Sequence, residues 1–397
     1  MPPSASPTRR PTSFLLLYAL ANAGGVIGFL PLLTLLLPLK IEGVAGEARI
    51  TLLTATVFAG AVAASLSNIL FGWLSDRSVA RGTGRRRWIL VGLAWTTLSY
   101  AVIAIAATPT AIILAVVFFQ IALNAMLGPL VAVMADEIPD EQKGWTSGLL
   151  SLAYPTASGV LAGLVEVSRG EATRLAVVVA LIAVCIVPLA LTRSHALPID
   201  DSRTAVTMQR RDLVAAWLAR LLFQVSGVVL QLYLLYYFES IMPLSAAGQL
   251  APRVGGLLTL SFILPLPLAL LVGRLSDRLQ RRKPFLFAAA MVSATGLLGM
   301  ALAHGWTAGA VAFSCYAIGY GVFLPLQNAF AMQLLPNPRK RGRDLGFLNL
   351  TNTLPSLLGP ILTWELATPR DFGAAMMALV GLTFAGGVVM LGVRGRR

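Results

Sequence analysis

The chain alternates between long apolar runs and short polar breaks that contain charged residues, proline or glycine. Runs of about 18 or more apolar residues can cross a hydrocarbon layer of roughly 30 Å as helices. The pattern predicts twelve membrane-spanning helices, numbered here as spans 1 to 12 in chain order. They cover residues 13–38, 50–75, 88–107, 110–134, 146–168, 173–192, 212–238, 253–276, 284–303, 306–334, 345–366 and 371–393.

The composition supports this interpretation. Charged residues make up 12% of the chain, hydrophobic residues make up 57%, and the mean hydropathy is +0.77. A soluble domain carries about 25% charged residues. Because helices satisfy their own backbone hydrogen bonds in lipid, we expect an all-α polytopic membrane protein.

The second half of the chain repeats landmarks of the first half. The pattern Gly-x-Leu-Ser-Asp-Arg occurs at residues 72–77, after span 2, and again at 273–278, after span 8. Gly144 follows span 4 as Gly342 follows span 10. A polar stretch at 193–211 separates the two halves. We predict an N-terminal six-helix bundle at 1–192, a cytoplasmic linker at 193–211 and a C-terminal six-helix bundle at 212–397 as pseudo-symmetric repeats.

The basic residues predict the orientation. The termini and the loops on their side hold 24 of the 31 Lys and Arg residues, and the opposite loops hold six. By the positive-inside rule, we expect both termini in the cytoplasm. We also expect a monomer, located in the cytoplasmic (inner or plasma) membrane. The net charge of +14 is spread over short loops between spans, which argues against a nucleic-acid partner.

The loop after span 2 resembles the signature loop of the major facilitator superfamily, and the loop after span 8 resembles its second copy. The residues that carry the resemblance are Gly72, Asp76, Arg77, Gly84, Arg85 and Arg86, and Gly273, Asp277, Arg278, Arg281 and Arg282. Within the superfamily, the chain looks most similar to sucrose transporters and glycoside–pentoside–hexuronide symporters. Those symporters place paired carboxylates in span 2, where this chain has Ala64 and Asn68.

The resemblance implies that the two loops act as conformational latches. An aspartate at the membrane edge can lie against the N-terminus of a neighbouring helix, where the helix dipole favours negative charge. The alternative is that the charges only set the topology. The expected latch residues are Gly72, Asp76, Arg77, Arg85, Asp277 and Arg278.

The resemblance also implies that spans 1, 4, 7 and 10 line the substrate cavity. Each carries polar or aromatic residues that fall on one helical face. The candidate substrate-binding residues are Asn22, Gln120, Asn124, Arg220, Gln224, Gln231, Tyr316, Tyr320 and Gln327. The alternative for the amides is hydrogen bonding between helices. Arg220 is expected either to bind an anionic group or to serve a structural role.

Few residues offer coupling to an ion. Asp136, Glu137 and Glu166 lie near the ends of their spans, where carboxylates are usually solvated, and Glu166 is the candidate coupling residue. Mid-helix prolines at 155 and 355 predict kinks or gating points. We expect no metal and no cofactor, because His195 and His304 lie in loops and the chain has no phosphate-binding glycine loop.

The sequence thus favours a secondary or facilitative transporter of a small polar solute, with a sugar or glycoside preferred. The partners expected are the solute, the bilayer and a coupling ion such as H⁺ or Na⁺. The alternatives are an exporter or flippase of amphipathic compounds, lipids or organic anions, and a non-transporting assembly factor. An enzyme is not expected.

Overall fold

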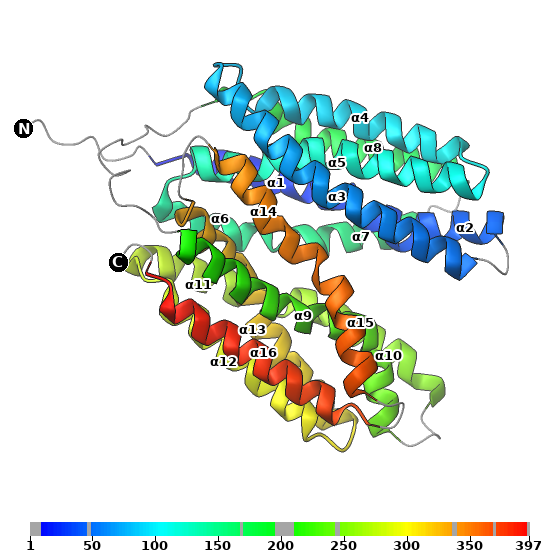
Figure 1. The fold of residues 1–397 in the computed structure, drawn as a ribbon, viewed down its shortest axis with the longest axis vertical. Helices are drawn as coiled ribbons and strands as arrows, with labels where there is room; N and C mark the ends of the chain where they lie inside the picture. Colours follow the sequence, from blue (N-terminus) through cyan, green and yellow to red (C-terminus); the bar gives the residue numbers. More distant parts are fainter. Residues whose placement is uncertain are drawn as a thin grey trace, which may run out of the picture. The chain divides into compact units, whose positions relative to one another are not determined.

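The computed structural model describes residues 9–45, 49–166, 170–194, 210–242, 247–335, 340–367 and 371–394. All the regular elements of these residues are helices (Figure 1). In the first half they are α1 (Thr12–Ile27), the π-helix η1 (Leu32–Leu36), α2 (Leu37–Ala45), α3 (Arg49–Ala80), α4 (Arg86–Ile105), α5 (Pro109–Glu137), α6 (Asp140–Leu150), α7 (Ala153–Glu166) and α8 (Glu171–Ala190). In the second half they are α9 (Arg210–Ile241), α10 (Ala247–Ile263), α11 (Leu266–Leu279), α12 (Lys283–Ala301), α13 (Trp306–Gln333), α14 (Arg341–Thr353), α15 (Pro355–Leu366) and α16 (Gly373–Gly392).

The chain folds into two compact units, and each unit takes one segment from the opposite half of the sequence. Unit 1 comprises Met1–Pro139, Leu152–Thr204 and Asn337–Asn349. Unit 2 comprises Asp140–Ser151, Ala205–Pro336 and Leu350–Arg397. Helix α6 therefore packs with the helices of the second half, and the first part of α14 packs with those of the first half.

Within the described residues, ten helices are long and apolar enough to cross a membrane. Ten of the twelve predicted spans correspond to them. Spans 5 and 11 are not among them. Span 5 corresponds to α6 and α7, and span 11 corresponds to α14 and α15. Most of the predicted linker, at residues 195–209, lies outside the described residues.

A proline lies beside the point where each of spans 5 and 11 divides. Pro155 lies in the first turn of α7, and Pro355 is the first residue of α15. A proline has no backbone N–H to donate and its ring clashes with the preceding turn, so it is best accepted at a helix start. Pro129, Pro188 and Pro325 lie inside α5, α8 and α13, so a proline alone does not end a helix in this chain. The predicted kinks are thus present as helix breaks at equivalent places in the two halves.

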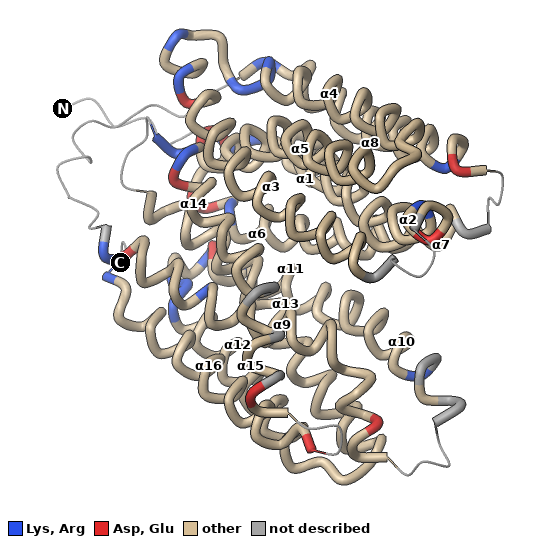
Figure 2. Tube along the Cα trace, turned by 45° about the vertical axis from the view of Figure 1, so that its right-hand side comes forward, with Lys and Arg blue, Asp and Glu red and all other residues tan. Residues whose placement is uncertain are grey.

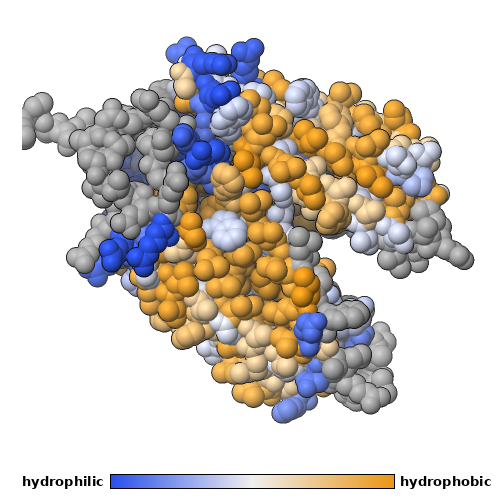
Figure 3. Space-filling view, in the orientation of Figure 1, coloured by the Kyte–Doolittle hydropathy of each residue, from blue (hydrophilic) through white to orange (hydrophobic). Residues whose placement is uncertain are grey.

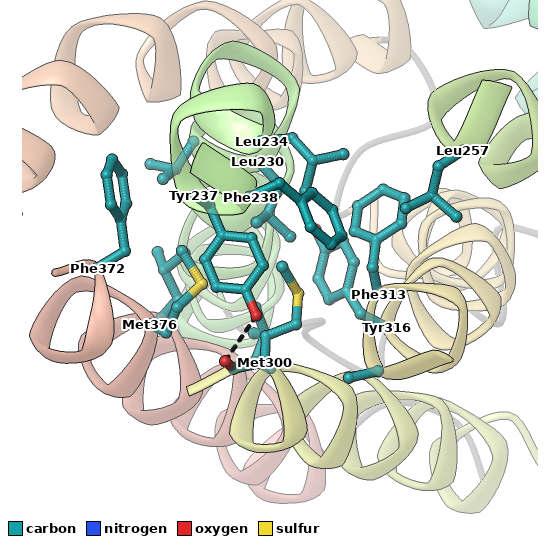
Figure 4. Packing of buried hydrophobic residues seen from close by; sticks show 14 of the residues in the cluster. Leu230, Leu234, Tyr237, Phe238, Leu257, Met300, Phe313, Tyr316, Phe372 and Met376 are labelled. Carbon is teal, nitrogen blue, oxygen red and sulfur yellow. Dashed lines mark hydrogen bonds between the residues drawn. The ribbon is translucent and has the colours of Figure 1, made fainter. Parts of the chain in front are cut away.

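The interior of unit 2 contains a cluster of apolar side chains from α9, α10, α12, α13 and α16. Tyr237 and Phe238 of α9 are 2% and 0% exposed and face Met300 and Phe313 (Figure 4). The Tyr237 hydroxyl donates a hydrogen bond of 2.7 Å to the carbonyl oxygen of Met300. A buried hydroxyl is thus satisfied, and α9 is tied to the end of α12.

The surface of the chain matches a bilayer environment. Large apolar side chains such as Ile105, Leu191 and Val311 are 66–80% exposed, and the face in Figure 3 is predominantly hydrophobic over the helices. Within each unit, most Lys and Arg residues lie at one end of the helices (Figure 2). We call this the basic end of each unit. The uneven distribution is the one that the sequence predicts for cytoplasmic loops.

Candidate functional site

Asp76, near the end of α3, contacts the first turn of α14 within unit 1. Its carboxylate accepts hydrogen bonds of 2.8 Å from the backbone N–H of Gly342 and 3.0 Å from that of Arg343. The side chain of Asp76 also forms an ion pair of 2.8 Å with Arg85. The first N–H groups of a helix have no partner inside the helix, so a carboxylate here satisfies them and complements the helix dipole. This is the geometry that the sequence predicts for Asp76.

Arg85 connects two carboxylates and a hydroxyl. It donates to Asp76, to Asp136 at 2.5 Å and to the Ser75 hydroxyl at 2.6 Å. Arg341 of α14 reaches the same Asp136 at 3.2 Å. Burial alone would lower the pKa of the Arg85 guanidinium, but the carboxylates of Asp136 and Asp76 outweigh burial and raise it. Arg85 therefore stays charged at any physiological pH.

Glycines permit the close approach of α3 and α14. A Cβ atom at Gly72 would collide with the carbonyl group of Gly342, and a Cβ at Gly342 would collide with the carbonyl oxygen of Gly72. The loop that returns the chain to Arg85 also needs glycine, because Gly82 and Gly84 have φ angles of 77° and 71°. L-residues with a side chain rarely adopt such angles.

Asp277, at the end of α11, makes the equivalent contact in unit 2. Its carboxylate accepts hydrogen bonds of 2.9 Å from the N–H of Gly144 and 2.7 Å from that of Trp145, both in α6. Arg282 forms an ion pair of 2.8 Å with Asp277 and donates to the carbonyl oxygen of Asp140 at 2.6 Å. A Cβ at Gly273 would come within 2.5 Å of the Gly144 carbonyl oxygen. The second loop therefore reproduces the contact of the first.

The structure separates the expected latch residues into two groups. Gly72, Asp76, Arg85 and Asp277 lie in these contacts. Arg77 is exposed, with its guanidinium carbon 3.8 Å from the centre of the Trp73 ring, and Arg278 is also exposed. In the second loop, the ion-pair partner of the aspartate is Arg282, which belongs to the motif but not to the predicted latch residues.

A network of amide side chains surrounds Arg220 in unit 2. The Arg220 guanidinium donates to the side-chain oxygens of Gln327 at 2.8 Å, of Asn328, and of Asn352 at 3.2 Å. Gln224 donates to the same Asn352 oxygen at 2.6 Å. We call this set, together with Tyr320, the Arg220 network.

Tyr320 extends the Arg220 network along α13. Its hydroxyl donates a hydrogen bond of 2.6 Å to the Gln224 side-chain oxygen. Arg220 and Gln327 are 6% and 0% exposed, whereas Asn352 is exposed and Gln224 and Tyr320 are half-buried. The network therefore combines buried residues with residues that are partly or fully exposed.

Two predicted residues of the same helices lie outside the network. Gln231 is exposed on α9, and Tyr316 is 3% exposed within the apolar cluster of unit 2. The Tyr316 hydroxyl lies 3.1 Å from that of Ser226. The structure thus brings together four of the six residues predicted in spans 7 and 10: Arg220, Gln224, Tyr320 and Gln327.

The polar residues of unit 1 bond mainly between and along helices. Asn68 of α3 donates to the side-chain oxygen of Asn124 at 2.8 Å, and Asn124 donates to the backbone oxygen of Gln120 at 2.8 Å. Asn124 and Gln120 are 4% and 9% exposed. Asn22 is half-buried on α1. For Asn124, this geometry matches the alternative of a hydrogen bond between helices.

Three amides in these networks are absent from the predicted site. In the sequence, Asn68 lies in span 2, Asn352 lies near Pro355, and Asn328 follows Gln327 directly. A search for adjacent amides on span 10 could have found Asn328. Asn352 contacts residues more than 100 positions earlier in the chain, which no helical periodicity reveals.

The carboxylates near the span ends differ from expectation. Glu137 is 2% exposed and forms ion pairs with Arg10, at 2.7 Å, and with Arg86. The expectation that it is solvated is therefore wrong, because two arginines from other segments cover it. Glu166 ends α7, and its side chain lies outside the described part of the structure. Among the described residues, no cluster of three or more His, Cys, Asp or Glu could hold a metal ion.

Comparison with known proteins identifies the fold. Residues 213–397 match the sequence model of the Major Facilitator Superfamily. No curated protein sequence matches the chain.

Three solved structures illustrate the structural similarity. A variant of the E. coli fucose:proton symporter FucP is 16% identical, with a TM-score of 0.72 over 97% of this chain and 99% of that one. The proton:xylose symporter XylE, bound to 6-bromo-6-deoxy-D-glucose, is 12% identical, with a TM-score of 0.76 over 97% of each chain. A bacterial homologue of the iron transporter ferroportin, in the outward-facing state, is 13% identical, with a TM-score of 0.75 over 98% of this chain and 100% of that one.

These identities are too low to indicate a substrate, and the narrower resemblance to sucrose and glycoside transporters stays a prediction. The chain has the all-α fold that these solved structures share, the fold of the major facilitator superfamily, and its residues 213–397 match the sequence model of that superfamily.

Proposed function

We propose that the chain is a secondary or facilitative transporter of a small polar organic solute, with a sugar or glycoside preferred, and that it works by alternating access. The observation that carries the proposal is the Arg220 network. Its amides can both donate and accept hydrogen bonds, and the Tyr320 ring adds an aromatic face, which together suit a ligand rich in hydroxyl groups.

The contacts of Asp76 and Asp277 support the alternating-access part of the proposal. Asp76 accepts hydrogen bonds from the first turn of α14 and Asp277 from the second turn of α6, and each of these helices comes from the opposite half of the sequence. Breaking these hydrogen bonds would release α14 from the N-terminal helices and α6 from the C-terminal helices. We propose that this release accompanies the movement of the two bundles, with the basic ends in the cytoplasm.

The experiment is uptake into proteoliposomes. A thermal-shift screen of the purified protein against sugars, organic acids, nucleosides and lipids, at two pH values and with or without sodium, first selects a solute. Gln224→Ala should then reduce uptake about tenfold, because it leaves polar partners unsatisfied at a cost of about 1–3 kcal/mol.

Matched variants separate a binding site from a structural role. Gln231→Ala removes the same side chain two turns further along α9, outside the Arg220 network, and should leave uptake unchanged. Asn124→Ala should lower the melting temperature by breaking the bond to Asn68. Uptake that is normal in Gln224→Ala and lost in Gln231→Ala would contradict the proposed site. If no solute shifts the melting temperature or enters vesicles, a non-transporting assembly factor becomes the better interpretation.

The position of Arg220 favours a second candidate, a transporter of organic anions. The guanidinium lies at the base of the network, and its planar fork suits a carboxylate or phosphate group. Arg220→Gln should abolish the transport of acidic solutes in this case. If the solute is a neutral sugar, the same variant should retain measurable uptake.

A further inference from the structure

We propose that unit 2 carries a binding site for an anionic phospholipid in the leaflet opposite its basic end. The site is a groove of about 370 Å³ between α10 and α13. Arg253 and Trp306 lie at one end of the groove, apolar side chains form its wall, and Ser314 lies toward the other end. This site is separate from the Arg220 network and does not depend on the proposed transport function.

The order of these residues along the two helices matches the order of groups in a lipid. Arg253 lies in the second turn of α10, and Trp306 is the first residue of α13. Leu260 and Ser314 follow them by seven and eight residues, which is about 10–12 Å along a helix. The charged end therefore lies at headgroup depth and the apolar wall extends toward the hydrocarbon. Trp is the residue that favours this interface.

The charge of the groove selects the headgroup. Arg253 is exposed, and its guanidinium carbon lies 5.8 Å from the centre of the Trp306 ring. The described residues that line the groove supply this one positive charge and no carboxylate. Arginine binds phosphate through its planar fork. A zwitterionic headgroup would also place its positively charged ammonium near Arg253. The described residues of the lining contain no negative side chain that could pair with this ammonium.

The wall of the groove favours an acyl chain over a water-soluble ligand. Val311 is 66% exposed and Leu260 is 44% exposed. The span formed by α10 and α11 has the smallest buried share of the ten membrane-crossing helices, at 22%. An exposed apolar surface of this kind marks a contact with lipid or with another apolar partner. In a bilayer, the chain of a phospholipid whose headgroup is held by Arg253 would fill the groove.

Two neighbouring glycines allow a matched test. Gly256 lines the groove, and Gly255 is exposed beside it but is not part of the lining. A Cβ at either position would meet no atom within 4 Å. Gly256→Leu therefore places a Cβ in the groove without a clash and should fill it with the rest of the side chain, and Gly255→Leu makes the same chemical change outside it.

The experiment is native mass spectrometry of the full chain, released from detergent after titration with phosphatidylglycerol or phosphatidylcholine with the same acyl chains. Arg253→Gln should weaken phosphatidylglycerol binding about fivefold, since a basic residue near an anionic lipid surface contributes about 1 kcal/mol. The same variant should leave phosphatidylcholine binding unchanged. Gly256→Leu should remove the same bound lipid, and Gly255→Leu should behave as the wild type. All variants keep the basic loops and the lipids that bind to them. Differences in lipid binding between the variants and the wild type therefore come from the groove.

A double variant tests whether both changes act on one lipid. Arg253→Gln combined with Gly256→Leu should bind phosphatidylglycerol no more weakly than Gly256→Leu alone. If the wild type and Arg253→Gln bind phosphatidylglycerol equally well, the proposal that the groove selects an anionic headgroup is wrong. A preference for phosphatidylcholine or a sterol at this site would also contradict it. Equal effects of Gly256→Leu and Gly255→Leu would overturn the groove itself.

Discussion

Replacement of Asp76 by asparagine should open the first turn of α14. The asparagine keeps the shape of the side chain, but it removes the negative charge and turns one acceptor oxygen into an NH₂ donor. One of the N–H groups of Gly342 and Arg343 then faces a donor instead of a carboxylate oxygen. Arg85 also loses one of its two carboxylate partners.

The size of the effect follows from the hydrogen bonds that are lost. A hydrogen bond to a charged group contributes about 1.5–3 kcal/mol, and the asparagine weakens two such bonds to the backbone. We expect the free energy of opening this turn to fall by about 3 kcal/mol, which corresponds to an open population about 100-fold larger.

Amide hydrogen exchange measures this opening directly. The amides of Gly342 and Arg343 are the second and third of α14, where a helix offers no internal acceptor, so their protection comes from Asp76. Mass spectrometry of peptides covering residues 340–349 should show exchange about 100-fold faster at these two amides in Asp76→Asn. The later amides of α14 should exchange as in the wild type.

Two variants serve as controls for this measurement. Arg77→Gln changes the next residue, which is exposed over the Trp73 ring, and should leave exchange unchanged. Asp277→Asn makes the same change in unit 2 and should leave exchange in α14 unchanged. Unchanged protection in Asp76→Asn, or the same acceleration in Arg77→Gln, would refute the assignment of the protecting contact to Asp76.

Two further predictions concern stability and are checked by the melting temperature of the purified protein. Gly92→Ala should destabilise the fold by about 1–3 kcal/mol, because its Cβ would collide with the backbone of Met126. Gly163→Ala should be neutral or slightly stabilising, because its Cβ would meet no atom within 4 Å. Tyr237→Phe should cost about 1 kcal/mol through the lost hydrogen bond to Met300, and an unchanged melting temperature would show that this bond does not hold α9 against α12.

The sequence predicts the helices well because their cause is local. Apolar runs between polar breaks locate the spans, and Pro155 and Pro355 locate the helix breaks. It does not predict that α6 and the start of α14 pack with the opposite halves, because that arrangement depends on contacts between residues 132 to 267 positions apart, such as those of Asp76 and Asp277.

The candidate site is predicted in part for the same reason. Helical spacing places Arg220 and Gln224 on one face, and both join the network. It also places Gln231 on that face. However, Gln231 lies eleven residues after Arg220, which is about 16 Å along the axis of α9 and away from the partners of Arg220. Asn352 joins the network through a helix that begins beyond the predicted cavity spans, so only the packing reveals it.

The exchange of segments between the units constrains how the protein is made. Unit 1 includes Asn337–Asn349, so the ribosome must synthesise most of the polypeptide before that unit has all its parts. Until α14 has been synthesised, Asp76 and Gly72 lack the contacts with Gly342 that they make in the folded protein. Unit 1 therefore cannot be completed until residue 349 has been synthesised, so its final assembly is a late event in the biogenesis of this chain.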